Sequence, residues 1–275
     1  MTLLQALFMA ALQGVTELFP VSSLAHGIIT PKILGWDIDL KSEAFLPFLV
    51  AMHVGTASAA FLYFWNDWWK MGRAVLGQGT PDTVKRERHM LVQIIIATIP
   101  AVLIALILQK KLYLIFGMPE LAAGFLILNG FLLFLGERRR RRGGERILAD
   151  LTWVDSLLIG LAQSLALLPG ISRSGTTMIS GLLRGFHHED AARFSFLISF
   201  PIIMGAGVHE LPKLLHAEAG IVHLSIIAGI TAAVISYATI FALMRYFKGN
   251  DIKALDPFAI YCWVAGAASL ALLLS

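Results

Sequence analysis

Long apolar stretches alternate with short polar ones along this chain of 275 residues. Six stretches contain roughly 18 or more mostly apolar residues each, which is enough for a helix to cross a bilayer core about 30 Å thick. They lie at about 44–65, 91–110, 120–136, 191–211, 221–247 and 255–274. The pattern therefore predicts an all-α integral membrane protein with six transmembrane helices.

Two further apolar segments are interrupted by polar residues and by proline or glycine. They are "QGVTELFPVSSLAHG" at 13–27 and "AQSLALLPGISRSGTT" at 162–177. We expect each to enter and leave the membrane on the same side, as re-entrant helical hairpins over 3–30 and 154–184, because irregular backbone is tolerated there when it lines a cavity. In the first hairpin, a helix from Leu3 to roughly Phe19 is expected to end near Pro20.

The two interrupted segments are related by an internal repeat. Gln13 and Gln163 are 150 positions apart, and so are Ser22 and Ser172. Each half then contains one hairpin and three spans, with repeat 1 at about 1–137 and repeat 2 at about 154–275, in a single membrane domain over 1–275. Three crossings separate the hairpins, so we predict an inverted-topology repeat whose hairpins meet near the membrane midplane from opposite faces.

The distribution of charge supports a membrane protein with a defined orientation. Hydrophobic residues make up 57% of the chain and charged residues only 15%, which excludes an ordinary soluble domain. With both hairpins re-entrant, sixteen Lys and Arg residues fall on one side and five on the other, which places both termini on the extracytoplasmic side. We interpret the run "ERRRRRGGER" at 137–146 as a cytoplasmic topology signal, and expect no nucleic-acid partner. The paired His187 and His188 are expected to be solvated at the cytoplasmic interface.

The first hairpin concentrates groups that can move protons. Gln13 and Glu17 share one helical face at a spacing of four residues. A carboxylate buried in a membrane must be paired or must coordinate something. Of the two serines Ser22 and Ser23, one is explained as a helix cap. His26 is a natural proton carrier near neutral pH.

The second hairpin has the composition of an anion site. Helix-start N–H groups, hydroxyls and one guanidinium together form an oxyanion cradle, and an arginine fork suits phosphate. An internal ion pair between Arg173 and Glu17 in the empty protein is the alternative, and it does not exclude phosphate. The predicted phosphate-binding residues are Ser22, Ser172, Arg173, Ser174, Gly175 and Thr177.

Brought together at one midplane site, these groups suit phosphoryl transfer on a substrate with a lipid tail. Glu17, with Gln13 as a tentative second ligand, would hold a divalent cation, Mg²⁺ or Ca²⁺, together with a substrate diphosphate.

The two motifs resemble those of the undecaprenyl-diphosphatase (bacitracin-resistance) family. Residues 13–27 match its (E/Q)xxxE segment and the following P-V-S-S-x-x-H, and "PGISRSGTT" is similar to its PGxSRSGxT motif. The resemblance implies a bacterial inner-membrane enzyme with six spans and two re-entrant hairpins. Such an enzyme hydrolyses undecaprenyl diphosphate to undecaprenyl phosphate with a divalent cation, and so recycles the lipid carrier of peptidoglycan synthesis. Glu17 and Gln13 then occupy the acidic motif.

By the same resemblance, Ser22, Ser23 and His26 are catalytic neighbours, and Arg173 binds phosphate with Ser172, Ser174 and Thr177. The chain departs from the family pattern at Leu24 and Ala25, where Thr-Gly is common, and Gln13 leaves one carboxylate fewer for the metal. His53, in the middle of a span, is expected to have a supporting role.

The predicted mechanism has Ser23 attacking the terminal phosphorus, His26 acting as general base and then acid, and Arg173 stabilising the phosphoryl group. Two variants stay open: His26 as nucleophile, and a metal-activated water. The rival function is a lipid-phosphate transporter or flippase that uses the same site. The oligomeric state is also open, with a homodimer as one option.

Overall fold

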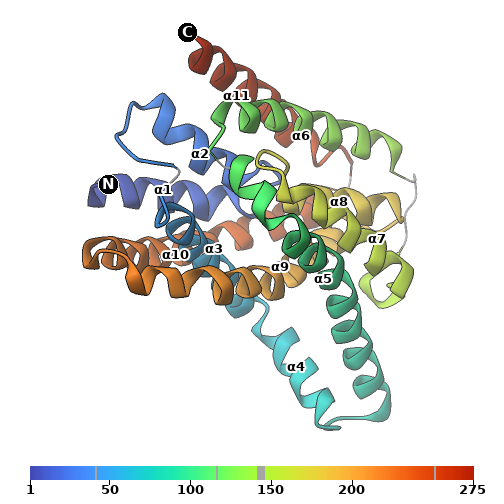
Figure 1. The fold of residues 1–275 in the computed structure, drawn as a ribbon. Helices are drawn as coiled ribbons and strands as arrows, with labels where there is room; N and C mark the ends of the chain where they lie inside the picture. The colour runs from blue at the N-terminus through green and yellow to red at the C-terminus, as the bar shows by residue number, and fades with distance from the viewer. Residues whose placement is uncertain (41, 116, 141–145, 251) are drawn as a thin grey trace.

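The computed structural model describes residues 1–275 except 41, 116, 141–145 and 251, and it leaves the side chains of 109–114 and 215 undescribed as well. Half of the basic run at 137–146 therefore lies outside the described residues, as do the side chains of Lys41, Lys110 and Lys111. No strand occurs in the described part of the chain, and its helices are drawn in Figure 1. They are α1 (Leu3–Thr16), α2 (Ser23–Ile33), α3 (Phe45–Tyr63), α4 (Trp65–Val75), α5 (Pro81–Ile115), α6 (Pro119–Arg139), α7 (Trp153–Ser164), α8 (Arg173–Leu183), α9 (His188–Glu210), α10 (Ala219–Gly249) and α11 (Asp256–Leu274), with short 3-10 helices at Leu148–Asp150, Leu165–Leu167 and Leu211–His216.

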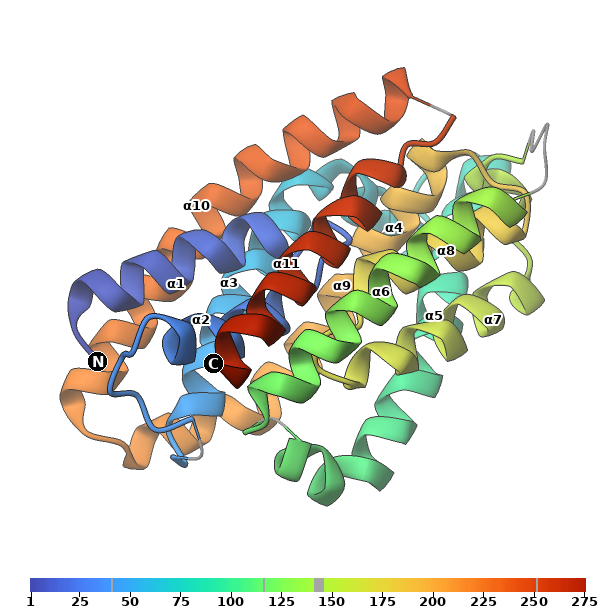
Figure 2. The same cartoon turned by 90° about the horizontal axis from the view of Figure 1, so that it is seen from above.

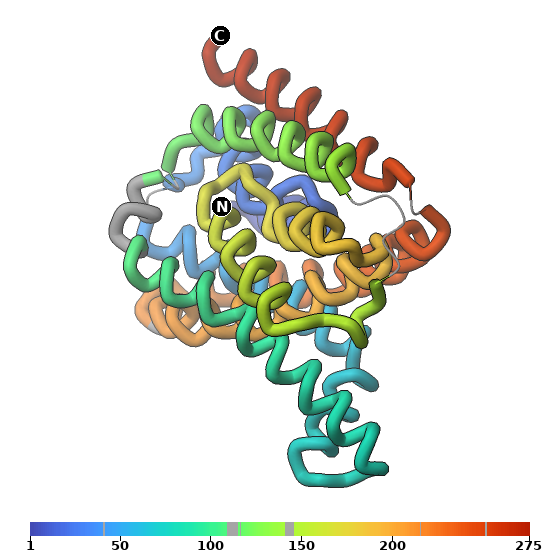
Figure 3. The backbone as a smooth tube through the Cα atoms, turned by 90° about the vertical axis from the view of Figure 1, so that its right-hand side faces the viewer, coloured from blue at the N-terminus to red at the C-terminus, as the bar shows by residue number. Residues whose placement is uncertain are grey.

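Six helices are long and apolar enough to cross a membrane, which confirms the predicted number of spans. They are α3, α5, α6, α9, α10 and α11, and each overlaps one of the six predicted stretches. The prediction did not include α4, nor the start of α5 at Pro81. These segments form a polar helical arm that projects from the other helices, as Figure 1 and Figure 3 show.

The two interrupted segments each form a pair of short helices. The longest of the four, α1, has 14 residues, so it is about 21 Å long and too short to cross the hydrocarbon core alone. It ends at Thr16, three residues earlier than predicted, and residues 17–21 form turns before α2. A proline disfavours helical backbone at the residue before it, and Pro20 lacks an N–H, so this segment favours a break between two helices.

The short helices pack against long helices of the other half of the chain. Helix α1 packs on α10, and α7 packs on α5. Helix α3 contacts α9, while α6 and α11 run side by side (Figure 2). Helices α3 and α10 approach so closely that an added Cβ at Gly55 would overlap the backbone carbonyl of Gly229, so only glycine fits there. The turns between α1 and α2 and between α7 and α8 are thereby held in the interior.

Candidate functional site

Two serines begin the second helix of each pair in the same way. Ser22 is the N-cap of α2, and its Oγ accepts a hydrogen bond from the N–H of Ala25 at 3.4 Å. Ser172 is the N-cap of α8, and its Oγ accepts from the N–H of Gly175 at 3.1 Å. Both helices have 11 residues, and the first residues within them are Ser23 and Arg173. The N-terminus of such a helix attracts anions through its free N–H groups and its dipole.

The two turns are bonded to each other. Asn129 of α6 is fully buried; its Nδ2 donates to the carbonyl of Pro20 at 2.9 Å, and its Oδ1 accepts from the N–H of Ser172 at 3.0 Å. The N–H of Gly170 donates to Ser22 Oγ at 3.2 Å. Ser174 Oγ donates to the carbonyl of Phe19 at 3.1 Å. Segments half the chain apart therefore form one rigid unit.

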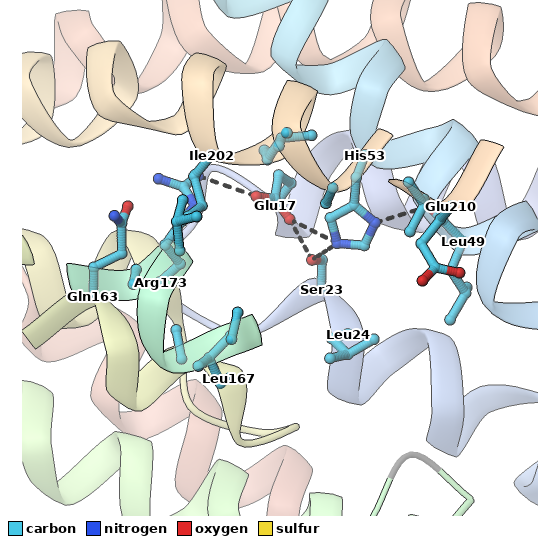
Figure 4. A pocket seen from close by; sticks show the side chains of 18 of the residues that line it. Glu17, Ser23, Leu24, Leu49, His53, Gln163, Leu167, Arg173, Ile202 and Glu210 are labelled. Atoms are coloured by element: carbon cyan, nitrogen blue, oxygen red, sulfur yellow. Dashed lines mark hydrogen bonds and ion pairs between the residues drawn. The ribbon is translucent and has the colours of Figure 1, made fainter. Parts of the chain in front are cut away.

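A cluster of polar side chains lies where the two turns meet (Figure 4). Ser23 Oγ donates to Glu17 Oε2 at 2.5 Å, and Arg173 Nη2 donates to Glu17 Oε1 at 3.0 Å. Gln13 Nε2 also donates to Glu17 Oε2, at 3.2 Å. His53 Nε2 lies 3.3 Å from Glu17 Oε2 and 3.4 Å from Ser23 Oγ. The ion pair between Glu17 and Arg173 that the sequence offered as an alternative is thus present.

The orientation of His53 follows from its second nitrogen. His53 Nδ1 lies 2.8 Å from the backbone carbonyl of Leu49. A carbonyl oxygen only accepts, so Nδ1 carries a proton, and the ring is held with Nε2 facing Ser23 and Glu17. Ser23 Oγ has a single hydrogen and a much shorter contact with Glu17. Ser23 therefore donates this hydrogen to Glu17, and His53 Nε2 lies beside both groups.

The cluster forms the polar end of a cavity of about 380 Å³. Glu17, Ser23, His53 and Arg173 line it together with Ser22 and Ser172, while most of the remaining wall is aliphatic side chains from α3, α5 and α9. A space of this size holds a small ligand group. The combination of an anion-binding end and an apolar wall suits a phosphorylated lipid.

Not all of the predicted phosphate-binding residues reach this cavity. Ser22, Ser172 and Arg173 line it, whereas Ser174, Gly175 and Thr177 do not. Thr177 Oγ1 bonds to Ser195 Oγ at 2.7 Å and to the carbonyl of Arg173 at 2.8 Å, so it supports the helix that carries the arginine.

The structure does not bring His26 to the cluster. His26 Nδ1 contacts the carbonyl of Ser22 at 2.7 Å, and Nε2 contacts Tyr261 Oη at 2.8 Å, with the two rings stacked 5.7 Å apart in a second, separate pocket. The reason is helical geometry. Ser23 and Leu24 line the main cavity, so its direction lies between them, and at about 100° per residue His26 points roughly 110° away.

His26 instead supports the backbone of Ser22, the residue that precedes Ser23. Ser22 has a φ of 65°, in the left-handed region that non-glycine residues rarely adopt. The contact from His26 to the carbonyl of Ser22 helps to hold this conformation. Among the described contacts, His53 and not His26 lies beside Ser23, and His26 as the general base stays a prediction.

Sequence reasoning missed Asn129 and Gln163, and it did not place His53 beside Ser23 and Glu17. All three are polar residues in apolar segments, which was the available signal, but no spacing within the sequence indicates which of them face the same cavity. Gln163 lines the cavity wall beside Arg173, and Glu210 lines it as well. The prediction that His188 is solvated is wrong: it is fully buried, with Nε2 2.8 Å from Glu137 Oε2.

The described residues do not form a preassembled cation site. Glu17 already has four polar contacts to its two oxygens, and Gln13 directs its amide nitrogen, not its oxygen, at this carboxylate. No group of three or more His, Cys, Asp or Glu side chains with metal-ligand geometry occurs among them. A divalent cation on Glu17 and Gln13 stays a prediction.

The comparisons with known proteins all point to one family. The family model described as "Bacitracin resistance protein BacA" matches residues 6–268. Undecaprenyl-diphosphatase of Acidiphilium cryptum (strain JF-5) is 51% identical over 278 residues, covering 99% of each chain. Undecaprenyl-diphosphatase of Granulibacter bethesdensis is 44% identical over 285 residues, covering 98% of this chain and 97% of the relative. Undecaprenyl-diphosphatase 2 of Chromobacterium violaceum is 41% identical over 272 residues, covering 98% of each.

Proposed function

Because this chain belongs to the BacA family of bacitracin resistance proteins, we propose that it hydrolyses undecaprenyl diphosphate to undecaprenyl phosphate and inorganic phosphate. The observation that carries the proposal is that Ser23 and Arg173 reach one carboxylate, Glu17, at the polar end of a cavity with an apolar wall. A serine nucleophile, a proton acceptor and a phosphate-binding arginine are the groups that this reaction needs. Transport of a lipid phosphate is not favoured, because the relatives are named as phosphatases.

In the proposed reaction, Ser23 Oγ attacks the terminal phosphorus while its proton passes to Glu17. The anhydride bond breaks, and undecaprenyl phosphate leaves with the bridging oxygen. Arg173 and the free N–H groups at the starts of α2 and α8 stabilise the charge on the transferring phosphoryl group. Water then attacks the phosphoserine and His53 accepts its proton at Nε2. The bond between phosphorus and Ser23 Oγ breaks, Glu17 returns its proton to that oxygen, and inorganic phosphate is released.

The divalent cation is not assigned a step in this mechanism. The described side chains around Glu17 and Gln13 are already bonded to one another and do not fit a preformed metal site.

We also propose the inverted repeat and its placement in the inner membrane. Three features support it: the matching lengths and caps of α2 and α8, the packing of α1 on α10 and of α7 on α5, and the bias of positive charge. In this proposal the short helix pairs, predicted at 3–30 and 154–184, are re-entrant, and both termini are extracytoplasmic. Single cysteines at Thr2 and Ser275, in a Cys262→Ser background, should react with an impermeant maleimide added outside intact cells; labelling only after lysis would contradict this orientation.

Phosphate release by purified protein in detergent tests the proposed activity, because a transporter needs two compartments and a phosphatase does not. Wild type should release phosphate from a prenyl diphosphate, and Ser23→Ala, Glu17→Ala and Arg173→Ala should each lose most of it. Acid quenching in the presence of labelled substrate should trap phosphate on Ser23. Phosphate release that is unchanged in these three variants would refute the assignment of the site.

A further inference from the structure

Gln163 has a buried acceptor atom without a partner in the wall of the cavity. The residue is 2% exposed, and its Nε2 donates to the backbone carbonyl of Ala97 at 3.3 Å. Reversing the amide would set Gln163 Oε1 against the Ala97 oxygen, and both are acceptors, so the atom that faces away from Ala97 must be Oε1. Nothing in the described part of the chain donates to Oε1.

Arg173 has a buried donor atom without a partner. Its Nη1 donates to the carbonyl of Ser195 at 3.1 Å and its Nη2 to Glu17 Oε1 at 3.0 Å. Its Nε is a buried donor for which the described residues offer no acceptor. A buried donor and a buried acceptor that both lack a partner are unfavourable, and each would be satisfied by the other.

The positions of the two residues allow this pairing. Gln163 lies on α7 and Arg173 on α8; these helices pack together, and both side chains line the same cavity. Figure 4 draws the Gln163 amide on the Arg173 side of the cavity, away from His53 and Glu210. The pairing requires a change of side-chain torsion that brings Gln163 Oε1 and Arg173 Nε together.

The internal repeat gives an independent reason to expect a role for this residue. Gln163 is 150 positions from Gln13, and Gln13 Nε2 contacts Glu17, the partner of Arg173. The two equivalent glutamines therefore lie beside the two members of the same ion pair. Gln13 presents a donor to the carboxylate, and Gln163 offers an acceptor on the side of the guanidinium.

We propose that Gln163 is a positioning residue that accepts a hydrogen bond from Arg173 Nε when a diphosphate occupies the cavity. The phosphate takes Nη1 and Nη2 as a fork, and Gln163 holds the remaining N–H, which fixes the plane of the guanidinium. This inference rests on the proposed function, because it requires a diphosphate to reach Arg173.

A double-mutant cycle on diphosphate binding tests the proposal. The probe is inorganic diphosphate, titrated by calorimetry into the full-length protein in detergent. Gln163→Leu should weaken binding roughly tenfold, because Arg173 loses its support. In an Arg173→Lys background, which keeps the charge but lacks this N–H, Gln163→Leu should change binding by less than about twofold. Ser164→Ala is the matched control and should have no effect, since within the described residues Ser164 Oγ bonds only to the Gly160 carbonyl of its own helix.

An equal loss in both backgrounds would mean a merely structural role and would overturn the proposal, as would no loss with Arg173 present. Gln163→Met, which has the same length and no acceptor, repeats the cycle if the leucine variant does not fold. Phosphate release from a prenyl diphosphate is measured in parallel. A wild type that binds diphosphate with the expected coupling but releases no phosphate would overturn hydrolysis and leave the role of Gln163 intact. A wild type that binds no diphosphate would overturn both.

Discussion

Asn129 joins the two turns that carry the candidate site, so its removal tests whether this junction matters. The side chain is fully buried and bonds to Pro20 on one turn and Ser172 on the other. Asn129→Leu keeps a side chain of similar size but removes both hydrogen bonds. The backbone carbonyl of Pro20 and the N–H of Ser172 would then be buried with their main partner missing.

The expected loss of stability can be estimated from these two groups. Each unsatisfied buried group costs about 1–3 kcal/mol, which gives about 2–6 kcal/mol for the pair. Pro20 O keeps a weak contact with Cys262 Sγ at 3.9 Å, so we expect the lower part of this range, about 2–4 kcal/mol. The effect on activity should be larger than the loss of folded protein, because Ser172 is adjacent to Arg173. A shift of about 1 Å at a reacting group lowers a rate roughly 100-fold.

Thermal unfolding in detergent and phosphate release, measured well below the melting temperature of every variant, separate the two effects. Asn250→Leu is the control, because Asn250 is exposed and its Nδ2 donates to the nearby carbonyl of Tyr246 at 2.9 Å, far from both turns. Asn129→Leu should melt at a lower temperature and release phosphate roughly 100-fold more slowly. An unchanged melting temperature with activity within about twofold of wild type would refute the role of Asn129 as a junction.

Three further predictions concern protons and metals. His53→Ala should lower kcat by about 10²–10⁴ and change the pH profile of kcat/KM, whereas His26→Ala should lower activity without moving that profile; the opposite result would return the base to His26. Burial alone raises the pKa of Asp155 at the start of α7, but hydrogen bonds from Arg146, Thr152 and Arg184 outweigh it and hold the pKa well below its ordinary value of 3.8. This carboxylate therefore stabilises the fold above pH 4 and loses that contribution as the pH falls further. Asp155→Asn should lower the free energy of unfolding at pH 7 by about 1–3 kcal/mol, since both guanidinium groups are partly exposed, and should lower the melting temperature accordingly. Below pH 4 the melting temperature of Asp155→Asn should fall less steeply with pH than that of wild type. A chelator should leave the melting temperature of the ligand-free protein unchanged, because no preformed cation site occurs among the described residues; a large decrease would contradict this.

The spans and the helix starts could be predicted because they depend on local sequence. Length and apolar content alone located α3, α6 and α11 to within a few residues. One serine cap after Pro20 was predicted from residue type, and Ser22 is that cap; Ser172 caps α8 in the same way, which was not predicted. The internal repeat also predicted that Glu17 and Arg173 lie in one site, and they form an ion pair.

The partners inside the site could not be predicted, because they depend on how helices rotate against one another. His26 lies three residues after Ser23, which suggested contact, yet the cavity lies on the far side of Ser23 from it. His53 comes from another helix, and only the packing of α3 in the interior brings its Nε2 to Glu17. Asn129 is likewise one polar residue in an apolar span, and its two partners depend on how α6 packs against both turns.

The ion pair between Glu17 and Arg173 links the empty protein to the proposed reaction. Neither charge is well solvated, since their side chains are 7% and 12% exposed, so each needs the other while the cavity holds no anion. A diphosphate carries more charge than a carboxylate and suits the guanidinium fork better, so it competes for Arg173. When Arg173 turns to the phosphate, Glu17 loses its cation but keeps its short hydrogen bond with Ser23, and it becomes a better proton acceptor for that hydroxyl. Arrival of the substrate would thus activate the nucleophile, and Glu17→Gln should bind diphosphate at least as tightly as wild type while releasing no phosphate. Weaker binding by Glu17→Gln would show that the carboxylate holds the substrate and does not compete with it.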